Sequence, residues 1–271
     1  MSSTSTSGST PGKSSNPYDV EEIINHYREH RPTYAQEVFE TIQAFCEENK
    51  AEFDLALDIA CGSGQATVPL AGIYKQAIGV DASASHVAKA PRHLSNITYK
   101  VADCNFPLNF IESGTVDLVS VASAVHWLDL NNFYAETDRM LKPGGVMAVF
   151  CGGFPSYEDQ EVLSIYKKIL ATTGETHPEQ MKVANDNMES FRLPYPNSKR
   201  FLPINRHLEA TAEQSIQMSL TIHSFQDYVQ KHPEYMEEVR QMFREWNKGD
   251  ESKTYKFAVP TYLLTSQKPT Q

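Results

Sequence analysis

Leu57-Asp-Ile-Ala-Cys-Gly-Ser-Gly-Gln65 is the most informative run in this chain of 271 residues. An apolar, β-prone segment, residues 53–60, leads into it, and the helix-forming segment 65–74 follows. This order predicts a buried strand, a tight glycine turn and a helix. Glycines at such a turn let the backbone approach a ligand closely, and the helix after it presents free N–H groups. The run therefore predicts a ligand-binding turn.

The same alternation continues along the chain. Strands are predicted at 76–81, 97–102, 116–122 and 146–151, and helices at 83–90 and 131–141. The run Lys142-Pro-Gly-Gly145 is expected to break the chain before the last of these strands. Strands that alternate with helices imply an α/β fold, in which a parallel sheet is covered on both faces. Ligands of such sheets bind at the carboxyl ends of the strands.

The two ends of the chain differ from this middle part. Residues 1–16 are rich in Ser, Thr and Gly, which predicts a disordered tail, and residues 17–271 are expected to form one domain. Residues 17–50, which include a predicted helix at 34–49, are expected to form N-terminal lid helices. Residues 152–206 read as a variable, substrate-side insertion, because regularity weakens there and prolines accumulate.

Secondary structure returns near the C-terminus. Helices are predicted at 161–172, 211–218, 224–230 and 234–246. A late β-rich segment, 255–264, has a natural partner strand near 200–207.

Composition limits the classes of function. The net charge of −10 argues against non-specific binding to nucleic acid, and no apolar run reaches the length of a membrane span. The four cysteines are far apart, which predicts no metal site and suits reduced thiols in the cytoplasm. The N-terminus lacks the apolar core of a signal peptide.

Two acidic residues end neighbouring predicted strands. Asp81 ends the second strand, where a carboxylate can accept hydrogen bonds from both ribose hydroxyls of an adenosine. Its alternative role is to start the helix ahead of Ser83. Asp103 follows the third strand, where it can accept from an adenine amino group or simply serve as a turn residue.

The glycine turn excludes two common phosphate-binding motifs. No Lys-Ser/Thr follows it, so it is not a Walker A loop, and Thr67 replaces the third glycine of a dinucleotide fingerprint. Four runs in order resemble the class I (Rossmann-like) S-adenosylmethionine-dependent methyltransferases. These are Leu-Asp-Ile-Ala-Cys-Gly-Ser-Gly-Gln-Ala, Gly-Val-Asp-Ala-Ser, Ala-Asp-Cys-Asn-Phe-Pro-Leu and Leu-Lys-Pro-Gly-Gly.

Two further runs are similar to the trans-aconitate methyltransferase-like subgroup. They are Tyr27-Arg-Glu-His-Arg-Pro-Thr-Tyr34 and Ala124-Val-His-Trp-Leu-Asp129. The resemblance implies a doubly wound, seven-stranded, mostly parallel sheet with an antiparallel last strand. It also implies S-adenosyl-L-methionine as cofactor, S-adenosyl-L-homocysteine as product, and a small-molecule acceptor. Ala60 departs from the family pattern, which has glycine there, and is tolerable if its φ is negative.

The resemblance also assigns residues to the cofactor. Asp58, Gly62 and Gly64 would line its methionine part, Asp81 would hold the ribose with Ala82 against the adenine, and Asp103 and Cys104 would border the adenine. Ala60 lies in the same loop, and Ala124 would face the reacting end. Tyr27 and Arg31 are assigned to the cofactor, in the segment that could cover it; Tyr27 and Tyr34 would close a lid, or else serve ordinary helix packing.

The acceptor side is assigned to residues from several segments. His126 is the candidate general base or a pocket-shaping group, and Trp127 a packing wall or a substrate contact. Tyr34, Arg192 and Tyr195 are candidate substrate contacts. A carboxylate acceptor, which the subgroup favours, needs no base but does need a cationic anchor. The candidate anchors are Arg31, Arg192, Arg200 and Arg206.

Competing interpretations remain open at this stage. The chain could bind the cofactor without catalysis, as a methyltransferase-like subunit, or it could be an NAD(P)-dependent oxidoreductase of similar architecture. A cytoplasmic monomer or weak homodimer, with no nucleic-acid or membrane partner, is the expected form.

Overall fold

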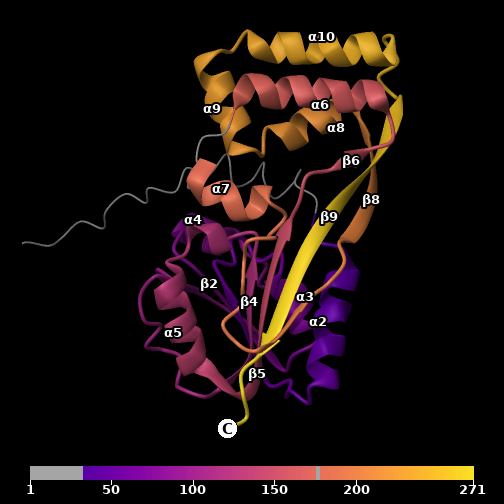
Figure 1. Ribbon diagram of the computed structural model, residues 1–271. Coiled ribbons are helices and arrows are strands. Elements are labelled where there is room, and N and C mark those ends of the chain that lie inside the picture. Colours follow the sequence, from indigo (N-terminus) through magenta and orange to yellow (C-terminus); the bar gives the residue numbers. More distant parts are fainter. Residues whose placement is uncertain (1–32, 175–177) are drawn as a thin grey trace, which may run out of the picture.

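A computed structural model describes residues 33–174 and 178–271. Its centre is one sheet with strand order β3-β2-β1-β4-β5-β9-β6, and β7 and β8 also pair with β9 (Figure 1). The strands are β1 (Leu55–Ile59), β2 (Gln76–Asp81), β3 (Ile97–Val101), β4 (Val116–Ala122), β5 (Leu141–Gly152), β6 (Ser156–Tyr157), β7 (Asn197–Arg200), β8 (Ile204–Thr211) and β9 (Thr254–Gln267).

The first five strands are parallel, and β9 is antiparallel to each strand that it contacts. The predicted α/β fold with an antiparallel last strand is therefore confirmed. The sheet has nine strands within the described residues, not seven, because the insertion contributes the short strands β6 and β7. The expected pairing of the late strand is also confirmed, since Ile204 of β8 lies opposite Thr261 of β9.

The run Lys142-Pro-Gly-Gly145 does not end the chain's extended structure. It lies inside β5, where the pairing with β4 shifts between Val116 and Leu118, so the run forms an irregularity in the strand. Gly144 has a φ of +84°, which a non-glycine residue adopts only with strain. The predicted break is therefore a bulge.

Helices cover both faces of the sheet and build a cap above its carboxyl end (Figure 1). They are α2 (Gln36–Glu48), α3 (Thr67–Ala71), α4 (Ala84–Lys89), the 3₁₀ helix η1 (Val125–Trp127), α5 (Leu130–Met140), α6 (Gln160–Thr173), α7 (Pro178–Asn185), α8 (Ala212–Ser219), α9 (His223–Lys231) and α10 (Tyr235–Asn247). No described helix is both long and apolar enough to cross a membrane.

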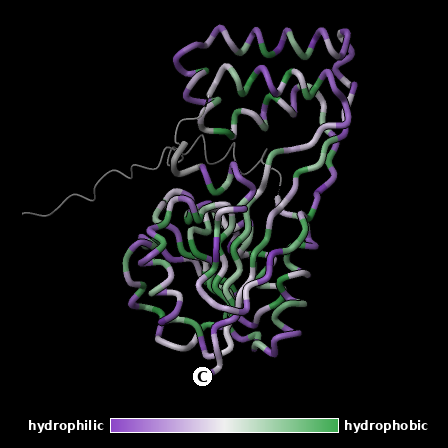
Figure 2. The backbone as a smooth tube through the Cα atoms, in the orientation of Figure 1, coloured by the Kyte–Doolittle hydropathy of each residue, from purple (hydrophilic) through white to green (hydrophobic). Residues whose placement is uncertain are grey.

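Apolar residues concentrate on the strands between the helices (Figure 2). One apolar cluster joins α2 and α3 to one face of the sheet, and a second contains residues of α5 and of the segment 188–195. Val38, Ile42 and Phe45 of α2 are buried in the first cluster. The helix predicted at 34–49, which was expected to belong to the lid, is therefore part of the core, because its apolar face packs on the sheet.

The cap has an apolar cluster of its own, formed by α6, α8, α9 and α10 with the distal ends of β8 and β9. Its centre is aromatic: the Tyr157 and Tyr166 rings stack at 4.5 Å, and the Tyr166 and Tyr255 hydroxyls lie 3.2 Å apart. The segment 152–206, predicted as an insertion, thus contributes α6 to the cap and β7 to the main sheet.

Candidate active site

The loops that follow β1, β2, β3 and β4 meet at the carboxyl edge of the sheet, below α7 and the cap (Figure 1). This is where parallel sheets bind ligands. Most of the residues assigned from the sequence lie in these four loops, so the topology brings together residues that are up to 70 positions apart.

The glycine turn has three residues in the left-handed region. The φ angles are +52° at Ala60, +55° at Gly62 and +86° at Gly64. A Cβ placed on Gly62 would meet no atom closer than 3.8 Å, whereas one on Gly64 would lie 2.3 Å from the Tyr99 hydroxyl oxygen. Gly62 is half-buried, and a Cβ there would make ordinary contacts with His86 and Gln65, so a ligand can reach only its exposed side; Gly64 is needed for packing. That Gly64 also lines the cofactor stays a prediction.

The sequence analysis expected alanine to be tolerated at position 60 only if its φ were negative. The observed φ of Ala60 is positive, so that expectation is wrong. A left-handed alanine is less stable than a left-handed glycine by about 1–2 kcal/mol, because its Cβ approaches the following carbonyl oxygen. Ser123, at the end of β4, is a second non-glycine residue in this region, with a φ of +52°. Such strain is often concentrated at functional sites.

Ala60→Gly is expected to stabilise the fold by about 1 kcal/mol, because the relief of strain exceeds the entropy that glycine adds to the unfolded chain. Urea unfolding measures the change. Ala135→Gly is a matched control, since Ala135 is exposed inside α5 and the same substitution there costs about 1 kcal/mol. Destabilisation at both positions would contradict the prediction.

Asp58 lies beneath the turn and is fully buried. The Thr67 hydroxyl donates to one of its oxygens at 2.6 Å and the Ser120 hydroxyl to the other at 2.8 Å. Burial raises the pKa of Asp58 from 3.8 to about 6, against the opposing effect of these two hydrogen bonds. Asp58 thus supports the turn from below, and its place beside the methionine part of the cofactor stays a prediction.

Asp58→Asn is expected to remove a pH dependence of stability. The raised pKa means that the folded state binds this proton more tightly than the unfolded state. Wild-type stability therefore falls as the pH rises from about 4 to about 7, by roughly 2 kcal/mol from this group, whereas asparagine does not titrate. Urea unfolding of both proteins at about pH 4 and pH 7 measures the difference. An equal difference at both pH values would contradict the raised pKa.

Asp81 ties the glycine turn to the neighbouring strand. The Gly62 N–H donates to one carboxylate oxygen and the Ser83 N–H to the other, each at 2.8 Å. Ser83 in turn caps α4 by accepting from the His86 N–H. Asp81 thus stabilises the helix start, as the alternative interpretation expects, and lies beside Gly62. Each oxygen can accept further hydrogen bonds, so its ribose role stays a prediction.

The residues expected around the adenine have different exposures. Ala82 and Asp103 are exposed, and one Asp103 oxygen accepts from the Asn105 N–H at 2.9 Å, as in a turn. Cys104 is buried, and burial raises the pKa of its thiol to about 12. Ala82 and Asp103 therefore remain accessible to a ligand, and Cys104 is a neutral packing group.

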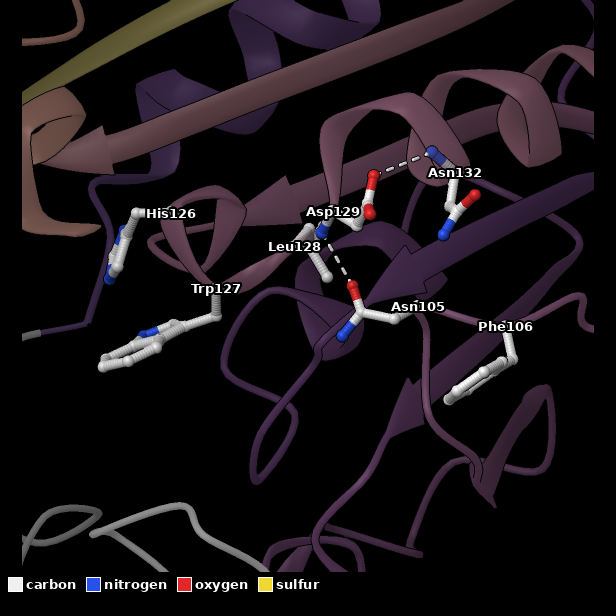
Figure 3. Close-up of a pocket in the computed structure, with 7 residues that line it drawn as sticks. All are labelled: Asn105, Phe106, His126, Trp127, Leu128, Asp129 and Asn132. Carbon is white, nitrogen blue, oxygen red and sulfur yellow. Dashed lines mark hydrogen bonds between the residues drawn. The ribbon is translucent and has the colours of Figure 1, made fainter. Parts of the chain in front are cut away.

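A pocket of about 510 Å³ opens where the loops after β3 and β4 meet (Figure 3). Its walls are Asn105, Phe106, His126, Trp127, Leu128, Asp129 and Asn132. The His126 and Trp127 rings lie on one side, 5.2 Å apart, and Phe106 lies on the other. The Phe106 and Trp127 side chains are 66% and 39% exposed, so aromatic surface is available to a ligand.

Two contacts hold this pocket in shape. The Asp129 N–H donates to the Asn105 side-chain oxygen at 2.7 Å, which joins the loop after β3 to the start of α5 (Figure 3). The Asp129 carboxylate accepts from the N–H groups of Asn131 and Asn132 and so caps α5. Ala124, expected at the reacting end, is buried just before η1, and its placement there supports His126.

Tyr34 lies beside the end of β4. Its hydroxyl donates to the Ser123 hydroxyl at 2.9 Å, and its ring packs edge-on against Phe150 at 4.9 Å. Both of these contacts attach Tyr34 to the sheet, and a substrate contact stays a prediction. Tyr27 and Arg31, assigned to the cofactor, lie outside the described residues.

Two assigned substrate contacts are engaged within the protein. Arg192 is exposed and donates to the carbonyl oxygens of Glu189 and Phe191 in its own loop. The Tyr195 hydroxyl donates to Asp138 at 3.0 Å, near the end of α5 and thus toward the amino edge of the sheet. Both side chains thus contact groups of the protein, and their roles as substrate contacts stay predictions.

The other arginines proposed as anchors are also engaged. Arg200 donates to the carbonyl oxygens of Met188 and Phe191, and Arg206 donates to Thr33. Among the lining residues that the structure describes, the pocket has no lysine or arginine. The described residues contain no group of three or more His, Cys, Asp or Glu side chains that could hold a metal ion.

Sequence reasoning did not identify Asn105, Phe106, Ser120 and Tyr99 as site residues. Asn105 and Phe106 directly follow the assigned Asp103 and Cys104, so the position after a strand was an available signal. Ser120 and Tyr99 lie inside strands, and their roles depend on which strands are neighbours. Strand periodicity alone does not reveal that.

Comparison with known proteins agrees with this arrangement. Residues 57–149 match the methyltransferase domain family. A protein of Dictyostelium discoideum that is named as a methyltransferase is 32% identical over 182 residues, which are 66% of this chain and 66% of that protein. A trans-aconitate 2-methyltransferase of Deinococcus radiodurans is 36% identical over 97 residues, which are 34% of this chain and 36% of that protein.

A solved structure shows the same fold over most of the chain. The protein, described as a type II methyltransferase of Anaeromyxobacter dehalogenans, is 24% identical and has a TM-score of 0.73. The match covers 88% of this chain and 99% of that one. The chain thus spans about two thirds of the Dictyostelium relative and about one third of the Deinococcus relative.

Proposed function

Because the chain belongs to the class I S-adenosylmethionine-dependent methyltransferases, we propose that it transfers a methyl group from S-adenosylmethionine to a small-molecule acceptor. The observation that carries this proposal is the pairing of Gly62 with Asp81. Gly62 is half-buried at the carboxyl edge of the sheet, and the Asp81 carboxylate beside it accepts from the Gly62 N–H at 2.8 Å.

The residues present fit the cofactor. Gly62 is half-buried, and three carboxylates, Asp58, Asp81 and Asp103, all lie near enough to the Cys104 thiol to raise its pKa. Negative charge there suits the positively charged sulfur and amino group of S-adenosylmethionine. When bound, the cofactor supplies a methyl group on an excellent leaving group. The protein's task is then to hold the acceptor in line at about 3 Å.

The pocket beside His126 is the proposed acceptor site. A hydroxyl, thiol or amine acceptor has a proton to lose, and His126 is the histidine in the pocket wall that can accept it. A carboxylate acceptor needs no base but needs a cation. Arg192, Arg200 and Arg206 each donate to groups of the protein, and a guanidinium has five N–H donors, so all four arginines stay candidate anchors for a carboxylate.

Two separate calorimetric titrations, one with S-adenosylhomocysteine and one with NAD, test which cofactor the protein binds. Binding of the first with a micromolar dissociation constant, and none of the second, is the expected result. A methyl-transfer screen of small carboxylic acids, phenols, thiols and amines then tests the activity. Failure of a folded sample to bind S-adenosylhomocysteine would overturn the proposal, and binding without turnover across the screen would favour a non-catalytic subunit.

We also propose a cytoplasmic monomer or weak homodimer. All four cysteines are buried thiols, which suits a reducing compartment. Light scattering during size-exclusion chromatography tests the assembly, and a stable higher oligomer would contradict it.

A further inference from the structure

The Tyr99 ring crosses from β3 to the glycine turn. Tyr99 lies directly opposite Gly79 in the pairing of β3 with β2. A Cβ on Gly79 would lie 2.7 and 2.8 Å from two carbon atoms of the ring, so the ring fills the place of a side chain there. The same ring continues to Gly64, where a Cβ would lie 2.3 Å from the hydroxyl oxygen. Tyr99 therefore packs over β2 and under the turn at once.

The turn is consequently held from two sides. On one side the Asp81 carboxylate accepts from the Gly62 N–H. On the other side the Tyr99 ring lies against Gly64, whose N–H closes the turn by donating to the Cys61 carbonyl oxygen at 2.9 Å.

The contact with Gly64 involves the hydroxyl oxygen and two ring carbons of Tyr99, which would lie 2.3, 3.0 and 3.1 Å from a Cβ on Gly64. The hydroxyl is buried beside Thr67 without a hydrogen bond of normal geometry among the described residues. Burial raises the pKa of Tyr99 to about 12, so the side chain is neutral at physiological pH. Phenylalanine should therefore replace tyrosine with little effect, whereas a smaller or flexible side chain should not.

We propose that Tyr99 is a positioning residue for the cofactor, because its ring supports the glycine turn in the conformation that presents Gly62 to the ligand. This inference rests on the proposed function. It concerns a residue that does not touch the exposed side of Gly62 and acts through Gly64.

Tyr99→Leu is the test, with calorimetric titration of S-adenosylhomocysteine well below the melting temperature of each variant. The dissociation constant is expected to rise by about tenfold, and KM for S-adenosylmethionine to rise in parallel. The kcat at saturating cofactor and KM for the acceptor should stay within about twofold of the wild type. Tyr99→Phe should restore cofactor affinity to within about twofold of the wild type. If Tyr99→Leu does not fold, Tyr99→Met gives the same comparison, since it keeps volume without a rigid ring.

Tyr74→Leu is the matched control. Tyr74 is a buried tyrosine that packs on Phe53 at 5.1 Å, next to α3 and away from the turn. Its loss should lower the melting temperature and leave cofactor affinity unchanged. If the wild type binds S-adenosylhomocysteine, either of two results would overturn the inference. One is an unchanged affinity in Tyr99→Leu, and the other is an equal loss of affinity in Tyr74→Leu. No binding by the wild type itself would instead overturn the proposed function and the inference with it.

Discussion

Replacing Asp81 by alanine is expected to weaken binding of S-adenosylhomocysteine by about 10- to 100-fold. Ligand hydroxyls would lose an acceptor, which costs about 1–3 kcal/mol for each buried group left without a partner. The Gly62 and Ser83 N–H groups would also lose the partner that they contact at 2.8 Å, so the turn itself would loosen. Calorimetric titration of the folded variant measures the loss.

Two variants separate these contributions. Asp81→Asn keeps one oxygen acceptor without the charge, and we expect an intermediate affinity. Asp159→Ala removes another carboxylate that accepts from two backbone N–H groups, but at the start of α6 in the cap. It should lower stability and leave cofactor affinity unchanged. An Asp81→Ala protein with wild-type affinity would remove Asp81 from the cofactor site.

His126→Ala is expected to lower kcat by about 100- to 10,000-fold on an acceptor that must lose a proton, the usual contribution of a positioned general base. Cofactor affinity should change by no more than about twofold, since His126 lines the pocket beyond the glycine turn. Steady-state kinetics on the acceptor found by screening, together with calorimetric titration, measure both quantities.

The neighbouring Trp127 provides the control. Trp127→Phe keeps an aromatic wall in the same pocket and should affect KM for the acceptor more than kcat. On an acceptor that is already an anion, His126→Ala should leave kcat within about threefold of the wild type. An intact kcat on a protonated acceptor would show that His126 only shapes the pocket.

Much of the fold could be predicted because local patterns determine it. The predicted strands 76–81 and 116–122 have the bounds of β2 and β4, since short apolar runs between turn residues have few alternative structures. The run Lys142-Pro-Gly-Gly145 failed as a break, because pairing with β4 holds the backbone on both sides of the bulge. The cap was not predicted as a unit, because its cluster joins segments from Tyr157 to Phe257 that no local pattern connects.

The site shows the same division. The glycine turn, Asp81 and Asp103 were found because each follows a strand, and parallel strands end at one edge. The roles of Arg192 and Tyr195 stay predictions, because nothing in a polar, proline-rich segment indicates which way it crosses the sheet. Tyr99 was missed because its importance depends on its pairing with Gly79 and its reach to Gly64, neither of which is local.

The sequence by itself therefore determined the strand and helix alternation, the glycine turn and the edge of the sheet at which the candidate site residues gather, since these depend on periodicity and on glycine. Only the tertiary structure decided that Asp58 is buried with a raised pKa, that Ala60 is left-handed, and that Tyr99 lies under the turn. Burial, strain and long-range contact are properties of the packed chain, because each depends on atoms that the sequence places far apart.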